Sequence, residues 1–182
     1  MVDMMCTNAA WDPISALSRA DRDAFSNRWH ERTSLNLPGP FYTSDTDNCW
    51  TGRLEAPANV VYAGEYFTEH IYRQPRDPQE VSAVVHAASV ETFWGYGCDG
   101  DDHWTPEAVR AWWRDRASIA QAISESMTKL RNEQNSSAQE AAQGTQAYLA
   151  YLADGAEYDL RRYLFRLEQG HYPAVGQLLP EI

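Results

Sequence analysis

Two loops of this sequence contain the side chains that could carry out chemistry. Residues 41–53 and residues 91–104 each combine a cysteine, aspartates, tryptophan and glycine. If the loops meet in space, Asp47 could act as a base or metal ligand, Cys49 as a nucleophile and His103 as an acid or base. This hypothesis makes the chain a small hydrolase or transferase, dependent on a divalent metal or on a Cys/His pair.

The aspartates of the second loop could also hold a cation. Asp99, Asp101 and His103 alternate as the first oxygen ligands of an EF-hand loop do. The pattern fails because its sixth position is Trp104 instead of glycine and its twelfth is an arginine instead of glutamate. An EF-hand is excluded. A non-standard divalent site built on these aspartates and Asp102 is a weaker alternative to a solvated acidic loop, and Asp101 is the second candidate for a base. We expect no cofactor.

The remaining spacings do not match common catalytic motifs. Cys49, Cys98 and His103 are not paired as zinc ligands are. The sequence has no P-loop, no dinucleotide-binding glycine pattern, no G-x-S-x-G and no H-E-x-x-H. Nucleotide-dependent chemistry of the common kinds is therefore disfavoured, and a buried, inert thiol is the commoner state of a free cysteine.

Aromatic side chains in the same loops favour a second hypothesis, a binding surface. Tryptophan and tyrosine beside acids are typical of protein-binding hot spots and ligand pockets. The alternative is that these rings fold back into the core, as aromatic residues often do. The candidate contact residues are Trp50, Trp94, Tyr96, Asp99, Asp101, Asp102 and Trp104.

The charge of the chain indicates the kind of partner. Twenty-six acidic and fifteen basic residues give a net charge of −11, and the segment 40–105 holds eleven acids against three bases. A negative surface repels nucleic-acid phosphates and attracts basic proteins. We therefore favour a protein-binding module for a basic partner. This character is similar in type to that of immunity proteins and other small inhibitors of basic toxins or nucleases.

The sequence shows no membrane span and no signal peptide, and we expect no membrane partner. Its three cysteines, Cys6, Cys49 and Cys98, do not suggest a disulfide framework. These features predict a reduced, cytoplasmic protein.

Several elements must position the two loops. Ser18 and Asp21 predict a helix over 19–31, with Phe25 and Trp29 on one face. Residues 59–62 and 65–72 predict a β-hairpin. A helix should begin at Pro78 and run to about residue 88.

The C-terminal third predicts three helices, over 106–132, 138–153 and 157–169, which pack as a bundle with near-antiparallel neighbours. A capping box of Ser137 and Glu140 should begin the second of them. Arg116 lies on the apolar stripe of the first, so we expect it to extend to solvent or to pair with an acid such as Asp159.

The predicted fold class is α+β and mostly helical, with a small antiparallel β-hairpin or sheet, five to six helices and a C-terminal helical bundle. We expect one domain over 1–182, with an acidic α+β part at about 12–104 and a helical bundle part at about 105–170.

Overall fold

A computed structural model describes residues 11–182, so Cys6 lies outside the described residues. Within this range the chain forms seven α-helices, three short 3-10 helices and two antiparallel sheets of two strands each. The fold is α+β and mostly helical, as predicted. The described residues contain seven α-helices where five to six were expected, because the long predicted helix is divided and one short helix lies in the first loop.

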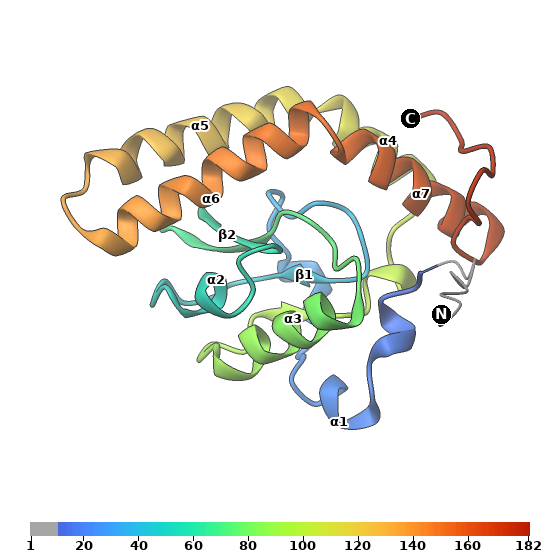
Figure 1. Ribbon diagram of the computed structural model, residues 1–182, viewed down its shortest axis with the longest axis horizontal. Helices are drawn as coiled ribbons and strands as arrows, with labels where there is room; N and C mark the ends of the chain where they lie inside the picture. Colours follow the sequence, from blue (N-terminus) through green and yellow to red (C-terminus); the bar gives the residue numbers. More distant parts are fainter. Residues whose placement is uncertain (1–10) are drawn as a thin grey trace, which may run out of the picture.

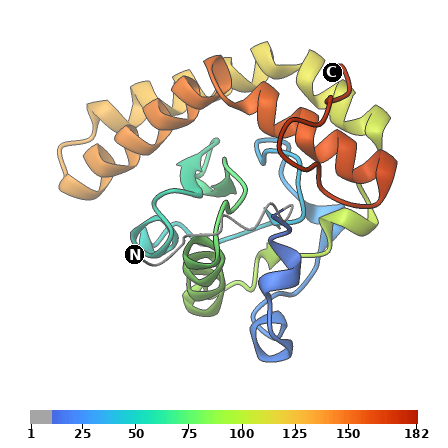
Figure 2. The ribbon, with the colours of Figure 1, turned by 45° about the vertical axis from the view of Figure 1, so that its right-hand side comes forward.

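The four C-terminal helices form the upper layer of the molecule (Figure 1). They are α4 (Pro106–Arg114), α5 (Arg116–Asn132), α6 (Ser136–Ala153) and α7 (Ala156–Gln169). α4 and α5 follow each other in one row, while α6 and α7 return beside them in a second row. The turned view in Figure 2 shows this layer arching over the rest of the chain.

The predicted antiparallel packing holds for α5 against α6 but not for α6 against α7. Gly155 separates α6 from α7 with a φ of 116° and only bends the row, so the two helices run end to end. Likewise, the single helix predicted over 106–132 is divided into α4 and α5 at Asp115, where ψ is 4°. These two bends let the layer curve over the lower part of the molecule.

Of two local predictions for this layer, the capping box is wrong and the exposure of Arg116 is confirmed. The side chain of Asn135 caps α6 by accepting from the Ala138 amide, so the predicted capping box of Ser137 and Glu140 is wrong. Arg116 extends to solvent, where its guanidinium lies 4.4 Å from the Trp113 ring centre. A cation can leave the apolar stripe in this way without an acidic partner.

The lower layer carries the sheets and three further helices, α1 (Arg19–Arg22), α2 (Thr51–Glu55) and α3 (Pro78–Val90). The predicted hairpin is confirmed as β2 (Val60–Ala63) paired with β3 (Thr68–Ile71), in a register that opposes Val61 and His70. The second sheet pairs β1 (Tyr42–Thr43) with β4 (Tyr96–Gly97). The 3-10 helices are Ile14–Ala16, Trp29–Glu31 and Gly100–Asp102.

The helix predicted over 19–31 is wrong beyond its first turn. Ser18 and Asp21 do form a capping box that begins α1. However, Asn27 adopts a left-handed backbone with φ of 56°, and its side chain accepts a hydrogen bond from the Cys98 amide. This long-range contact competes with helix propensity, and Phe25 and Trp29 consequently pack in different clusters of the core.

The hairpin lies at the centre of the core. Val61 and Ala63 pack into the cluster formed with α4, α5, α6 and α7, while Val60 and Ile71 pack with α3 in a second cluster. Both faces of the hairpin are therefore covered. No helix within residues 11–182 combines the length and apolarity needed to cross a membrane.

Candidate functional site

The two loops singled out in the sequence lie side by side. They pair through β1 and β4, and the pairing continues beyond the strands. The Ser44 amide donates to the Gly95 carbonyl at 2.7 Å, and the Thr92 hydroxyl donates to the Asp47 carboxylate at 2.8 Å. The loops therefore form one continuous structure, as the enzyme hypothesis required.

The antiparallel direction of this pairing nevertheless separates two proposed catalytic residues. It places residues 44–47 beside 91–95, and residues 40–42 beside 97–100. Cys49 and His103 thus lie beyond opposite ends of the paired segments and have different neighbours. The Cys/His pair of the enzyme hypothesis is not formed.

The surroundings of Cys49 do not activate a nucleophile. The nearby charge of Asp47, with contributions from Glu69 and Glu91, raises the pKa of the Cys49 thiol and keeps it protonated. Burial alone would raise the pKa of Asp47, but hydrogen bonds from the Cys49 amide and from Thr92 lower it. Asp47 is therefore a carboxylate held by local donors, with a structural role in joining the loops.

His103 lies at the other end of the paired loops. Its ring stacks on Trp29 with a centroid distance of 4.8 Å, and its Nε2 lies 3.1 Å from the Asp99 carboxylate. The other oxygen of Asp99 accepts from the Tyr42 hydroxyl at 2.7 Å. Arg32 adds a cation 4.0 Å from the Trp29 ring centre. Stacking and hydrogen bonding together fix the His103 ring against the surface.

Three exposed aromatic side chains lie on the hairpin turn and on the second loop, near the first end of the paired loops, and we call them the aromatic tip: Tyr66, Phe93 and Trp94. Their exposed fractions are 70%, 56% and 61%. The side chain of Asn48 donates to the Tyr66 carbonyl, and the neighbouring Asp47 binds Thr92, so the turn of the hairpin and the second loop are joined through residues 47–48.

The backbone of Trp94 is strained and held in place. Its φ is 57°, in the left-handed region that a residue with a side chain rarely adopts. The guanidinium of Arg28 donates to the carbonyls of Phe93 and Trp94 at 2.8 and 3.1 Å, and the Ser26 hydroxyl also donates to the Trp94 carbonyl. The surrounding chain therefore presents the indole in one fixed backbone conformation.

A buried carboxylate supports the same loop from beneath. Glu91 is 3% exposed, and its oxygens accept from the amides of Asp47, Phe93 and Gly95 at 2.7–2.9 Å. Three amide donors satisfy the buried charge, which is otherwise costly. Glu91 thus connects both loops below the aromatic tip.

Glu69 is a second buried carboxyl group, on β3 behind the tip. It accepts from the hydroxyls of Tyr62 and Tyr96 at 2.8 and 2.5 Å and from the Gly52 amide at 2.9 Å. Burial raises the pKa of Glu69 to about 7, although these hydrogen bonds oppose the shift. A Cβ on Gly52 would lie 2.4 Å from the carboxyl group, so only glycine allows this approach.

The aromatic contact residues predicted from the sequence differ in how far they are buried. Trp94 is exposed, whereas Tyr96 and Trp104 are 1% and 8% exposed and cannot contact a partner directly. Tyr96 is buried because its hydroxyl binds Glu69, and Trp104 because it packs edge-on against Trp29. Trp50 is half-buried against Tyr62. Tyr96 and Trp104 are therefore not exposed as expected, whereas Trp50 keeps part of its ring exposed.

The predicted acidic contact residues lie at the far end of the loops from Trp94. Asp102 is exposed, while Asp99 is engaged by Tyr42 and His103. Asp101 accepts from the Tyr163 hydroxyl at 2.9 Å and lies 3.5 Å from Arg166. Burial raises the pKa of Asp101, and these two partners oppose that shift. Asp101 therefore connects the second loop to α7.

Sequence reasoning missed Arg28, Phe93, Glu69 and Glu91 as parts of this site. Phe93 directly precedes Trp94 and could have been named as an aromatic residue of the same loop. Arg28 and Glu69 have no local signal because the groups that they bind in the site are distant in sequence, whereas Glu91 accepts from the nearby amides of Phe93 and Gly95 and from the distant amide of Asp47.

Within residues 11–182, no three His, Cys, Asp or Glu side chains are grouped as ligands of a metal ion. Neither a protein-family model, nor a curated protein, nor a solved structure matches this chain.

Proposed function

We propose that this chain is a non-enzymatic protein-binding module that binds a basic protein through the aromatic tip. The observation that carries the proposal is the exposed indole of Trp94 on a strained backbone fixed by Arg28 and Ser26. Backbone strain of this kind costs free energy and concentrates at functional sites. A large apolar ring held out to solvent at that cost fits a contact residue.

The tip has the composition and rigidity of a binding hot spot. Tryptophan and tyrosine are enriched among the residues that supply most of the binding free energy at protein interfaces. Because hydrogen bonds already fix the Trp94 loop, its ordering on binding loses little entropy. Tyr66 and Phe93 are further exposed aromatic side chains on the two segments that residues 47–48 join.

Charge favours a basic partner. Asp45 and Glu65 are exposed beside the tip, and Arg28 is paired with Glu31 at 2.9 Å. The whole chain adds a net charge of −11. Complementary charge accelerates the encounter of two proteins and excludes partners of the same sign. An inhibitor or immunity-type partner of a basic nuclease or toxin is the class of protein that fits these properties.

A pull-down from native lysate with the full chain as bait tests the proposal. We expect a basic protein to be retained by the wild type and lost with the Trp94→Ala variant. Tyr158→Ala is the matched control, since this tyrosine is 57% exposed on α7 and outside the tip. The retained protein is then purified, and its association rate with the bait is measured at increasing salt concentration.

The association rate should fall as salt rises, and the double variant Asp45→Asn/Glu65→Gln should associate more slowly at low salt. The proposal is wrong if no retained protein depends on Trp94, or if the partner that depends on it is acidic. It is also wrong if Tyr158→Ala abolishes retention to the same extent as Trp94→Ala.

A further inference from the structure

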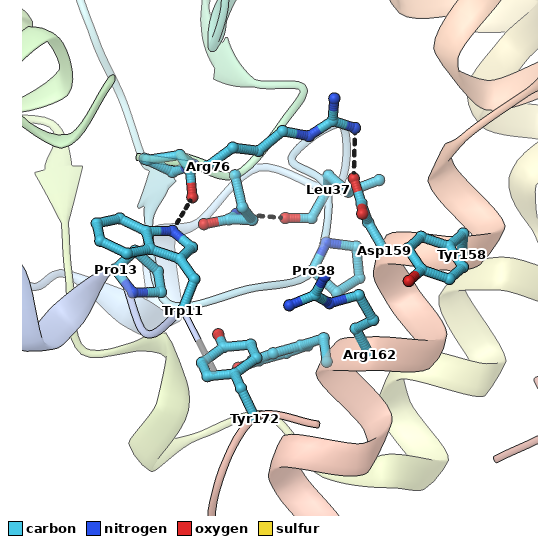
Figure 3. A pocket seen from close by; sticks show the side chains of 12 residues that line it. Trp11, Pro13, Leu37, Pro38, Arg76, Tyr158, Asp159, Arg162 and Tyr172 are labelled. Carbon is cyan, nitrogen blue, oxygen red and sulfur yellow. Dashed lines mark hydrogen bonds and ion pairs between the residues drawn. The ribbon is translucent and has the colours of Figure 1, made fainter. Parts of the chain in front are cut away.

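A cavity of about 420 Å³ lies between the N-terminal segment, residues 74–76 and α7 (Figure 3). Trp11, Pro13 and Pro38 form apolar walls, and Tyr158, Tyr163 and Tyr172 add aromatic ones. The Trp11 indole N–H donates to the Pro75 carbonyl at 2.9 Å, which fixes the wall nearest the N-terminal segment. The volume lies within the range of small-molecule sites, which are mostly apolar with a few polar groups.

Two arginines and one aspartate bring charge to this cavity. Arg76 is paired with Asp159 at 2.7 Å, and the Tyr151 hydroxyl donates to the same carboxylate oxygen at 2.7 Å. Arg162 differs: within residues 11–182 its guanidinium has no carboxylate within ion-pair distance. Figure 3 shows this guanidinium extending among Trp11, Pro38 and Tyr172.

The neighbouring acids are occupied by other groups. Asp101 is held by Tyr163 and Arg166. The side chain of Asp12, next to Trp11, accepts from the Ile14 amide at 3.0 Å. Of the three charged residues that line the cavity, Arg162 is thus the one whose guanidinium has no carboxylate within ion-pair distance in the described part of the chain.

We propose that this cavity binds a small aromatic carboxylate. The planar guanidinium of Arg162 matches a carboxylate through two parallel hydrogen bonds, and the ring of the ligand would lie between the aromatic and proline walls. The paired Arg76 and Asp159 close one side of the site. This ligand site is separate from the aromatic tip, so it does not depend on the proposed function.

Isothermal titration of the full chain with 2-naphthoate tests the proposal, with 2-naphthalenemethanol as the uncharged analogue. We expect saturable binding of 2-naphthoate and at least about tenfold weaker binding of the alcohol, a difference of about 1.4 kcal/mol. The Arg162→Met variant keeps the apolar stem and should weaken 2-naphthoate binding by a similar factor. Arg114→Met is the matched control, because Arg114 is an exposed cation at the end of α4.

Nuclear magnetic resonance locates the bound probe. The indole N–H signal of Trp11, assigned by its loss in Trp11→Phe, should shift on addition of 2-naphthoate. Thermal melts verify that both arginine variants remain folded. Absence of saturable binding to the wild type overturns the proposal. Equal affinity for acid and alcohol, equal affinity in Arg162→Met and wild type, or an unchanged Trp11 signal on saturation also overturns it.

Discussion

Glu69 couples the stability of the protein to pH. Its carboxyl group is buried between Tyr62 and Tyr96, and burial raises its pKa from 4.5 to about 7. Below pH 4.5 the group is protonated in both the folded and the unfolded chain. Between pH 4.5 and 7 only the folded chain keeps the proton, so folding becomes less favourable as pH rises.

We expect the free energy of unfolding of the wild type, relative to Glu69→Gln, to fall by on the order of 3 kcal/mol from below pH 4.5 to above pH 7. Glutamine carries no charge at any pH and avoids this loss. Urea denaturation of both proteins across this range measures the difference.

His70 contributes with the opposite sign. Burial lowers its pKa to about 4, so its contribution to stability is present above pH 6.5 and lost as pH falls. Because wild type and Glu69→Gln share His70, their difference isolates Glu69. Glu65→Gln, an exposed change in the same hairpin, keeps Glu69 and should therefore follow the pH dependence of the wild type. A wild-type curve parallel to that of Glu69→Gln would contradict the raised pKa.

Some residues of the candidate site could be predicted from the sequence, and others could not. Trp94 and Asp47 were found because their loops combine unusual residue types within a short span. Glu69 was not, since its carboxyl group becomes special only when distant chain segments bury it and supply donors. Glu91 was not, because the donor that makes it join the two loops, the Asp47 amide, is distant in sequence. The burial of Tyr96 and Trp104 was likewise decided by partners far along the chain.

At the scale of elements, α6 approaches α2 closely at Gly144. A Cβ on Gly144 would lie 2.7 Å from Nε of Arg53. Arg53 cannot easily move away, because its guanidinium binds Glu140 at 2.8 Å and the carbonyls of Pro57 and Val60 at 2.7 and 3.1 Å. Glycine in the middle of this helix therefore serves packing.

Gly144→Ala should lower the free energy of unfolding by about 1–2 kcal/mol, because the clash outweighs the gain of about 1 kcal/mol in helix propensity. Chemical denaturation measures the change, and Gln143→Ala on the exposed face is the control. In an Arg53→Ala background the same Gly144→Ala change should become neutral or stabilising. A stabilising effect in the wild-type background would show that the close approach is absent.

Elements were predictable where their signals were local. The start of α3 at Asp77–Pro78, the β2–β3 hairpin and the end of α7 at Gly170 all follow from caps and turn residues. The bend at Asp115 and the loss of helix after Arg22 do not, because tertiary contacts decide them. Propensity gives only a weak preference, which packing overrides.

At the scale of the whole molecule, the helical layer and the lower layer share one core. Val61 and Ala63 of the hairpin pack in the same cluster as Ile123, Tyr148 and Leu160. The hydroxyl of Tyr148 also donates to the Leu35 carbonyl at 2.8 Å, across the layers. Neither layer can bury its apolar face without the other.

We therefore expect a single cooperative unfolding transition, in which far-ultraviolet circular dichroism and tryptophan fluorescence give the same midpoint. Circular dichroism reports mainly the helices, whereas in a Trp112→Phe/Trp113→Phe variant, which lacks the two tryptophans of α4, the fluorescence of Trp29, Trp50 and Trp94 reports the lower layer. A fluorescence midpoint clearly below that of circular dichroism would mean that the layers unfold independently.

The left-handed backbone of Trp94 sets stability against recognition. Glycine adopts this conformation freely, and an indole that is 61% exposed contributes little to the core. Trp94→Gly should therefore leave the free energy of unfolding unchanged or raise it by up to about 1 kcal/mol, as thermal denaturation can measure. Repeated selection of variants for heat resistance alone would favour losing this tryptophan. If variants selected for partner binding retain this tryptophan, the residue lowers folding stability in exchange for binding affinity.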